Sequence, residues 1–256
     1  INDDLFNFTK GPRRLKIATG WLNFDKLPNW HTNLLEFEQY VSLHRWNWLL
    51  RSLTDEIEPA KFEWGISLVR SWVLTMGFCP KGEASESYTT GERISNLCLF
   101  ARSTNGIWTS LPNDLSNFVR EMGLDLARRI EYHPGKLNGN HIVNNARALL
   151  FAGHCTNTPE LVVIGRAILT DRLKSLVKDG FLIEGSSHYQ LLFTRWLLEI
   201  ALLAEERNDQ KTTVLIYSFL PYLLESCNFF LVREKNDSYL IPTLGDISPD
   251  AEPNWL

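Results

Sequence analysis

Residues 139–153, GNHIVNNARALLFAG, combine amide, imidazole and guanidinium groups within one predicted helix. Apolar residues recur at helical spacing and form one stripe: Ile142, Ala146, Leu149 and Leu150. The polar residues form a neighbouring strip: Asn140, His141, Asn144, Asn145 and Arg147. Because asparagine has poor helix propensity, three asparagines within six residues need a reason. Helix capping or bonding of a loop is one reason, and a polar wall facing a ligand with carboxylates is the other.

The stretch 178–190, KDGFLIEGSSHYQ, is the second candidate for chemistry. It is typical of a helix end, a glycine turn and a new helix start, with Ser187 in the position of an N-cap. Tyr189 then lies in the first helical turn, where the helix dipole slightly favours the anionic phenolate. Glu184 and His188 lie close to Tyr189 in the sequence. The alternative interpretation of all three is an ordinary helix surface.

Two shorter motifs lie outside these stretches. Arg93 and Asn96 are three residues apart near a predicted helix start, and Asp246 and Asp250 lie in a predicted turn. Both pairs also fit plain helix and turn chemistry. The histidines show no HxxxH or HExxH spacing, so local motifs predict no metal site.

Composition restricts the classes of protein. The 256 residues are 44% hydrophobic and 22% charged, which is enough apolar content for a sizeable core. The net charge of -4 argues against a general nucleic-acid binder, because phosphates need a basic excess. No run of about 18 apolar residues predicts a membrane span. The four cysteines are widely spaced, which favours free or buried thiols over a required disulfide.

From about residue 30 onward the hydrophobic pattern is helical almost without interruption. After a helical region within 30–50, we expect helices at roughly 59–76, 89–103, 113–132, 140–153, 159–178, 189–206 and 212–231. Short loops between them require antiparallel hairpins, packed as a bundle, a solenoid or a closed toroid. Residues 1–29 are expected to form an irregular arm. The chain begins at Ile1 and stops after a turn-rich segment, from which we expect a trimmed start and a cut end.

Taken in order, these stretches resemble the heparinase II/III-type polysaccharide lyases. The matching segments are 30–40, 88–96, 139–153, 179–189 and 244–250. Most specific is the Asn-His helix, followed about fifty residues later by the tyrosine loop. The resemblance implies an all-α fold, an incomplete (α/α) toroid over 30–235 with a groove for acidic polysaccharide. It also implies a C-terminal β-sandwich domain, to which 236–256, with the strand-like DSYLIPTLGD at its start, would lead.

The activity implied by the resemblance is β-elimination on uronic-acid chains, with no metal or other cofactor. Asn140 would bind the uronate carboxylate, His141 would act as base or in positioning, and Tyr189 as general base, general acid or both. Further substrate contacts would come from Arg93, Asn96, Asn144, Arg147, Glu184 and His188. A neutral amide stabilises the charge that develops on the carboxylate when C5 loses its proton. Adjacent cations such as Arg93 or Arg147 would lower the pKa of the phenol.

Two departures from the family pattern stand beside this resemblance. The first is Gln190, which follows the loop tyrosine at a position where family members often carry histidine. The second is that the 256 residues do not include the expected β-sandwich, which would supply a further catalytic side chain. Two alternatives remain: a toroid glycoside hydrolase using Glu184 and Asp246 as paired carboxylates, or a non-catalytic glycan-binding toroid. The tryptophans are expected mostly in the core. A periplasmic or secreted location follows from the resemblance alone.

Overall fold

The computed structural model describes residues 11–18, 20–32, 36–51, 59–78, 80–131, 139–233, 239–248 and 250. The α-helices in these ranges are α1 (Phe37–Arg45), α2 (Trp48–Arg51), α3 (Pro59–Met76), α4 (Ser87–Asn105), α5 (Asn113–Arg128), α6 (Asn140–Cys155), α7 (Pro159–Leu176), α8 (Ser187–Glu206), α9 (Gln210–Tyr217) and α10 (Leu220–Phe229). A 3₁₀ turn, Gly82–Ser85, precedes α4. None of these helices is both long and apolar enough to cross a membrane.

The described strands form three short antiparallel hairpins. They pair β1 (Arg14–Ile17) with β2 (Gly20–Asn23), β3 (Val177–Lys178) with β4 (Phe181–Leu182), and β5 (Val232–Arg233) with β6 (Tyr239–Leu240). The first hairpin differs from the irregular arm expected before residue 30. Alternation explains it, because Leu15 and Ile17 are buried in the core while Arg14 is exposed.

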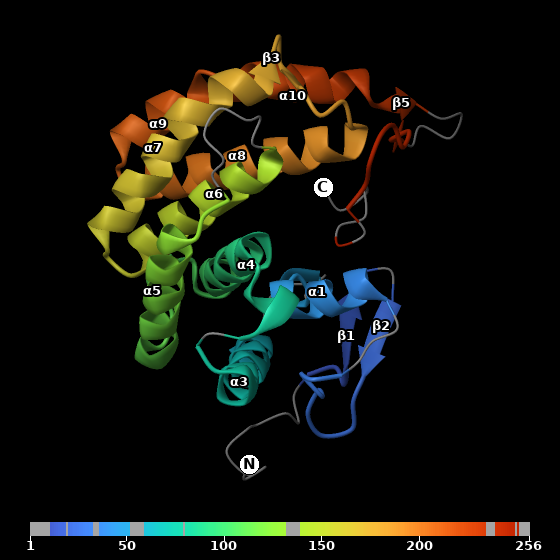
Figure 1. Ribbon diagram of the computed structural model, residues 1–256, viewed down its shortest axis with the longest axis vertical. Helices are drawn as coiled ribbons and strands as arrows, with labels where there is room; N and C mark the ends of the chain where they lie inside the picture. Colours follow the sequence, from blue (N-terminus) through green and yellow to red (C-terminus); the bar gives the residue numbers. More distant parts are fainter. Residues whose placement is uncertain are drawn as a thin grey trace.

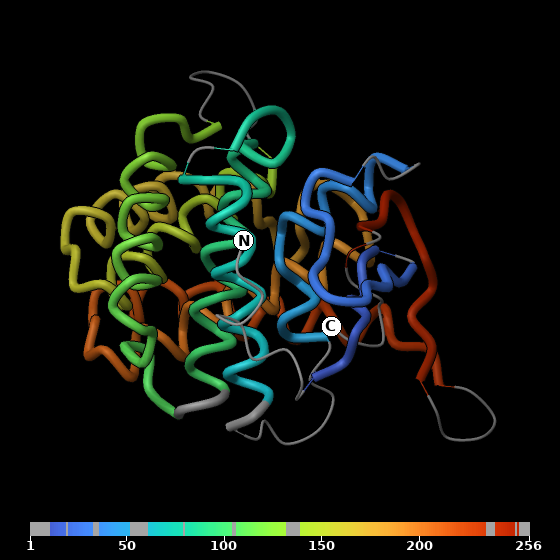
Figure 2. Tube along the Cα trace, turned by 90° about the horizontal axis from the view of Figure 1, so that it is seen from below, coloured from blue at the N-terminus to red at the C-terminus, as the bar shows by residue number. Residues whose placement is uncertain are grey.

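The helices stack as antiparallel hairpins in two rows that curve into an arc (Figure 1). In one row α6 packs between α4 and α8; in the other α5 and α7 lie against α6, and α9 lies against α8. Gly165 on α7 allows a close approach, since a Cβ there would lie 2.8 Å from the main-chain oxygen of Ala146 on α6. Seen from below, β1, β2 and α1 lie on the same side of the arc as the segment 239–248 (Figure 2).

Tryptophan dominates the core at the α1–α4 end. The fully buried tryptophans are Trp30, Trp46, Trp48, Trp64, Trp72, Trp108 and Trp196. A buried indole N–H gains from a hydrogen-bond partner, and Trp72 donates to Nδ1 of His44 over 2.9 Å. Burial lowers the pKa of His44 to about 3, so this imidazole is a neutral acceptor. The core assignment expected for the tryptophans is therefore correct for Trp30, Trp64, Trp108 and Trp196.

Two helical regions are interrupted where the pattern predicted continuity. Between α1 and α2, Trp46 adopts a left-handed conformation with a φ of 62°. The expected helix 212–231 divides into α9 and α10, and Pro221 lies in the first turn of α10. A continuous helix would bring the proline ring against the carbonyl of Tyr217, so the chain restarts the helix instead.

Candidate functional site

The N-terminus of α6 is held by a carboxylate from the loop before α8. Glu184 accepts hydrogen bonds from the backbone N–H of Asn140, at 2.6 Å, and from its Nδ2, at 2.9 Å. An anion at this position compensates the orphan donors and the positive end of the helix dipole. Partial burial raises the pKa of Glu184, while the Asn140 donors act in the opposite direction. One hydrogen of the Asn140 amide is thus fixed on Glu184, and the second remains for a ligand.

His141 follows on α6 and is oriented by Glu131. Its Nδ1 lies 2.9 Å from the Glu131 carboxylate, and its side chain is 48% exposed. An ionised carboxylate only accepts, so Nδ1 carries the proton and Nε2 of the neutral ring is the free acceptor. The ring of Tyr88 lies 4.5 Å from the imidazole. These contacts give the accessible histidine a defined tautomer, which a general base requires.

Tyr189 lies in the first turn of α8. Ser186, not the expected Ser187, is the N-cap and accepts from the backbone N–H of Tyr189 over 3.0 Å. The phenol oxygen lies 3.4 Å from Asp246, which is long for an O–H···O bond. Burial and the Asp246 carboxylate raise the pKa of Tyr189 to about 12. The expected lowering of this pKa is therefore wrong, and the phenol is protonated at neutral pH.

Asn140, His141 and Tyr189 line one cavity of about 260 Å³. The other lining residues are Phe37, Glu38, Arg45, Glu86, Tyr88, Asp246, Ile247 and Ser248. The cavity walls thus come from α1, the start of α4, the N-termini of α6 and α8, and the segment 246–248. An amide from one hairpin and a phenol from the next meet at the same hollow, as the roles implied by the family resemblance require.

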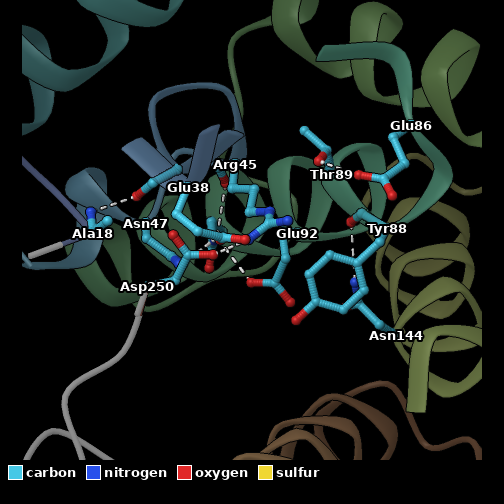
Figure 3. Close-up of polar contacts among 12 residues, drawn as sticks. Ala18, Glu38, Arg45, Asn47, Glu86, Tyr88, Thr89, Glu92, Asn144 and Asp250 are labelled. Carbon is cyan, nitrogen blue, oxygen red and sulfur yellow. Dashed lines mark hydrogen bonds and ion pairs between the residues drawn. The ribbon is translucent and has the colours of Figure 1, made fainter. Parts of the chain in front are cut away.

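Residues 242–248 and Asp250 close one side of this cavity and contact both α8 and α1. At α8, Ser187 Oγ donates to the main-chain oxygen of Pro242 over 2.6 Å. At α1, Arg45 forms a buried ion pair with Asp250 and lies 3.7 Å from Glu38 (Figure 3). The Arg45 guanidinium also lies 4.9 Å from the ring centroid of Tyr88. Arg45 is therefore already neutralised by protein carboxylates before any ligand binds.

Carboxylates outnumber cations on the cavity wall. Its acidic residues are Glu38, Glu86 and Asp246, and its basic residues are Arg45 and His141. Burial raises the pKa of Glu38, although Arg45 lowers it. The cavity is consequently not a strongly cationic groove, and attraction of an acidic sugar must come from directed N–H donors more than from net charge.

Arg93 and Asn96 do not reach the cavity, so their predicted role in substrate binding is wrong. The Arg93 side chain is buried between Trp46 and Trp72 and donates to main-chain oxygens of His44 and Ala84. Burial lowers its pKa to about 9. Asn96 is also buried, and its Nδ2 donates to the main-chain oxygen of Arg45 over 2.9 Å. These two residues fix α1 against α4.

Asn144 and Arg147 are buried as well, and their predicted contact with substrate is wrong for the same reason. Asn144 donates to the main-chain oxygen of Tyr88 over 3.1 Å. Arg147 bonds Glu92 at 2.9 Å and Glu199 at 2.7 Å, which joins α4, α6 and α8. Beside Arg147 and Asn96 is a separate void of about 10 Å³, which holds at most about one water. The polar strip of α6 therefore faces neighbouring helices rather than ligand, except at its first two residues.

Glu184 and His188 lie next to the site without lining the cavity. Glu184 acts on Asn140, as described above. His188 is 2% exposed, neither ring nitrogen has a hydrogen-bond partner among the described residues, and its ring packs edge-on against Tyr189. Burial lowers the pKa of His188, so the ring is neutral. The cavity residues absent from the sequence-based set are Phe37, Glu38, Arg45, Glu86, Tyr88, Ile247 and Ser248, and no local motif distinguishes them.

Comparison with known proteins gives a likeness in structure. No protein-family model and no curated protein matches the sequence. A mutant of the heparan sulfate lyase HepC from Pedobacter heparinus aligns with a TM-score of 0.58 and 18% identity, over 90% of this chain and 38% of that chain. HepC itself aligns with a TM-score of 0.56 and 19% identity, over 87% of this chain and 36% of that chain. A structure of heparinase III aligns with a TM-score of 0.60 and 21% identity, over 86% of this chain and 36% of that chain.

These alignments show the fold of this chain. The chain spans little more than a third of the length of the lyases it matches, between 36% and 38%. The likeness confirms the predicted fold class, an incomplete (α/α) toroid of antiparallel helical hairpins. The chain accordingly has the fold of the helical part of the heparinase-type lyases.

Proposed function

We propose that this chain is the helical, substrate-binding part of a polysaccharide lyase that cleaves uronic-acid glycans by β-elimination. The observation that carries the proposal is the convergence of Asn140, His141 and Tyr189 on one cavity. The fold shared with solved heparan sulfate lyases supports it. We also propose, from the resemblance alone, a partner β-sandwich domain that completes the groove, and a periplasmic or secreted location.

In the proposed reaction, the free amide hydrogen of Asn140 binds the uronate carboxylate and stabilises the charge that develops at C5. His141 Nε2 takes the C5 proton, because Glu131 fixes Nδ1 as the protonated nitrogen. The C5–H electrons form the C4–C5 double bond as the C4–O4 bond breaks. Tyr189 gives its proton to the leaving oxygen, a role suited to a phenol whose pKa is raised to about 12.

The division of labour between His141 and Tyr189 follows from their surroundings. Asp246 and burial keep the Tyr189 phenol protonated, which disfavours it as the initial base. His141 is half exposed, and Glu131 contacts its Nδ1, which leaves Nε2 directed away from that carboxylate. After the reaction the proton on His141 and the phenolate of Tyr189 return to their starting states by exchange through solvent.

A single experiment distinguishes the candidate functions. The protein is incubated with unsulfated and sulfated uronate polysaccharides while ultraviolet absorbance and reducing ends are followed together. A lyase produces both the conjugated double bond and a reducing end. Tyr189→Phe should abolish turnover and retain glycan binding, whereas Tyr222→Phe, at an exposed tyrosine of α10, should behave as wild type. Turnover by Tyr189→Phe at the wild-type rate would remove this residue from the mechanism.

A glycoside hydrolase remains the second candidate because the cavity carries the carboxylates of Glu38, Glu86 and Asp246. Hydrolysis needs one carboxylic acid and one carboxylate across the scissile bond. In the same assay a hydrolase gives reducing ends without ultraviolet absorbance, and a non-catalytic glycan-binding toroid gives neither.

A further inference from the structure

A second hollow, of about 360 Å³, opens at the far end of α6 from the candidate site. It is lined by Gly153, His154, Asn157, Pro159, Val162, Val163, Arg166 and Arg207. His141 and His154 are thirteen residues apart on α6, so the two sites are separated by roughly 20 Å along the helix. We call this region the distal hollow.

The lining of the distal hollow is basic and contains no acidic residue. Its charged groups are the guanidiniums of Arg166 and Arg207, whereas burial lowers the pKa of His154 and keeps its imidazole neutral. The carboxylate beneath them, Asp209, has a side chain only 6% exposed. In a protein with a net charge of -4, whose candidate cavity carries more carboxylates than cations, this cluster is a local positive region.

The hydrogen bonds of Asp209 are used within the protein. Asp209 accepts two bonds from Arg166 Nη2, at 2.8 and 2.9 Å, and lies 3.1 Å from His154 Nε2. It also caps α9 by accepting from the backbone N–H and hydroxyl of Thr212. Asp209 therefore holds Arg166 and His154 in place, and one carboxylate cannot neutralise both guanidiniums of the hollow.

Arg207 supplies the positive charge left without a compensating carboxylate. Among the described residues, its Nη2 donates to the neutral amide oxygen of Asn157 over 3.0 Å, and no ion pair to it is formed. The nearby acids on α8 have other partners, since Glu206 pairs with Arg102 and Glu205 accepts from Tyr217. Val163, 60% exposed, adds an apolar surface of the kind that contacts a sugar ring.

We infer that the distal hollow binds an acidic group of a polysaccharide, a carboxylate or a sulfate ester, through Arg207 and Arg166. The inference rests on the proposed function for the identity of the polymer. A guanidinium offers paired N–H donors that match both anions. The hollow then anchors a glycan at a distance from the cleavage site. The candidate cavity has more carboxylates than cations and does not attract an acidic glycan by net charge.

Calorimetric titration at low salt tests the inference, with three probes: an unsulfated glucuronate tetrasaccharide, a sulfated heparan tetrasaccharide and inorganic sulfate. Arg207→Gln should weaken oligosaccharide binding about tenfold, and added salt should weaken wild-type binding. Arg120→Gln, which removes an exposed arginine of α5, is the matched control and should leave the affinity unchanged. Preference for one tetrasaccharide identifies the acidic group as carboxylate or sulfate.

A second pair of variants covers the case in which Arg207 serves only as the cation at the C-terminus of α8. Val163→Asp places a negative charge in the hollow and should also weaken binding, whereas Val214→Asp, at an exposed position of α9, should not. Unchanged affinity in both Arg207→Gln and Val163→Asp overturns the inference, as does binding of inorganic sulfate but of neither oligosaccharide. If Arg207→Gln and Val163→Asp both weaken oligosaccharide binding, but the wild-type protein releases no unsaturated product, the proposed lyase activity is overturned and the inference about the distal hollow stands.

Discussion

Replacing Arg147 with methionine should destabilise the protein and leave glycan binding intact. The Arg147 side chain is 1% exposed and lies between Glu92 and Glu199, at 2.9 and 2.7 Å. Removing one partner of a buried ion pair leaves an uncompensated charge and lowers the free energy of unfolding by about 3–5 kcal/mol. Glu199 keeps its bond to Arg195 Nε at 2.9 Å, so the main loss is at Glu92.

For Arg147→Met we expect the lower end of the range of about 3–5 kcal/mol. Burial already raises the pKa of Glu92, so this carboxylate can become protonated in the variant. A loss of about 3 kcal/mol lowers the melting temperature by roughly 6–12 °C for a chain of this size. Urea unfolding followed by tryptophan fluorescence measures the change, since seven tryptophans of the described ranges are fully buried.

Two further variants make the measurement specific to the buried pair. Arg120→Met breaks an ion pair whose side chains are 48% and 53% exposed, and the free energy of unfolding should change by less than about 1 kcal/mol. Adding Glu92→Leu to Arg147→Met should recover part of the lost stability by removing the unpaired acid. If Arg147→Met unfolds at the wild-type urea concentration but loses its affinity for glycan, then Arg147 is a substrate contact and the reasoning fails.

Other consequences can be measured in the same way. Ser186→Ala removes the N-cap of α8 and should lower the free energy of unfolding by about 1 kcal/mol, with Ser175→Ala on α7 as control; an unchanged urea midpoint would contradict the capping role. Gly165→Ala should lower it by about 1–3 kcal/mol, because the new methyl group meets α6, and a more stable variant would refute that contact. The pKa of Tyr189 is raised from 10 to about 12 in the folded state, so the phenol's contribution to stability is complete below pH 10 and is lost as pH rises through about 12. The phenolate difference spectrum between wild type and Tyr189→Phe should have its midpoint near pH 12, and a midpoint at or below 10 would disprove the effect of Asp246 and burial.

The helices could be predicted because they depend on local signals, whereas the meeting of two site residues was expected only from the family resemblance. Helical periodicity placed α3 at its observed bounds, 59–76. Antiparallel hairpins of similar length bring the starts of α6 and α8 to the same end of the arc, which places Asn140 beside Tyr189. The N-cap was misplaced by one residue, since Ser186 and Ser187 are adjacent and equally suited to the position.

The polar strip of α6 could not be interpreted from its own sequence. Arg147 on a helix face has the same local pattern whether it meets a ligand or a pair of buried carboxylates. Glu92 and Glu199 lie more than fifty residues away on either side, so only the packing of α4 and α8 against α6 determines which partner Arg147 meets. The pairing of Arg45 with Asp250 was missed for a similar reason, because nothing near either residue indicates its partner.

The ion pair between Arg45 and Asp250 connects residues 205 positions apart. At about 5–20 residues per second on the ribosome, the arginine is made roughly 10–40 s before the aspartate that neutralises it. Near the end of that interval the nascent polypeptide holds the residues of α1 to α10 but lacks one wall of the pocket, and of the two carboxylates that pair with Arg45 it contains only Glu38. Maturation of the ligand-binding hollow is therefore the final event in the biogenesis of this region, and a stop codon shortly before residue 246 would yield helices without a site.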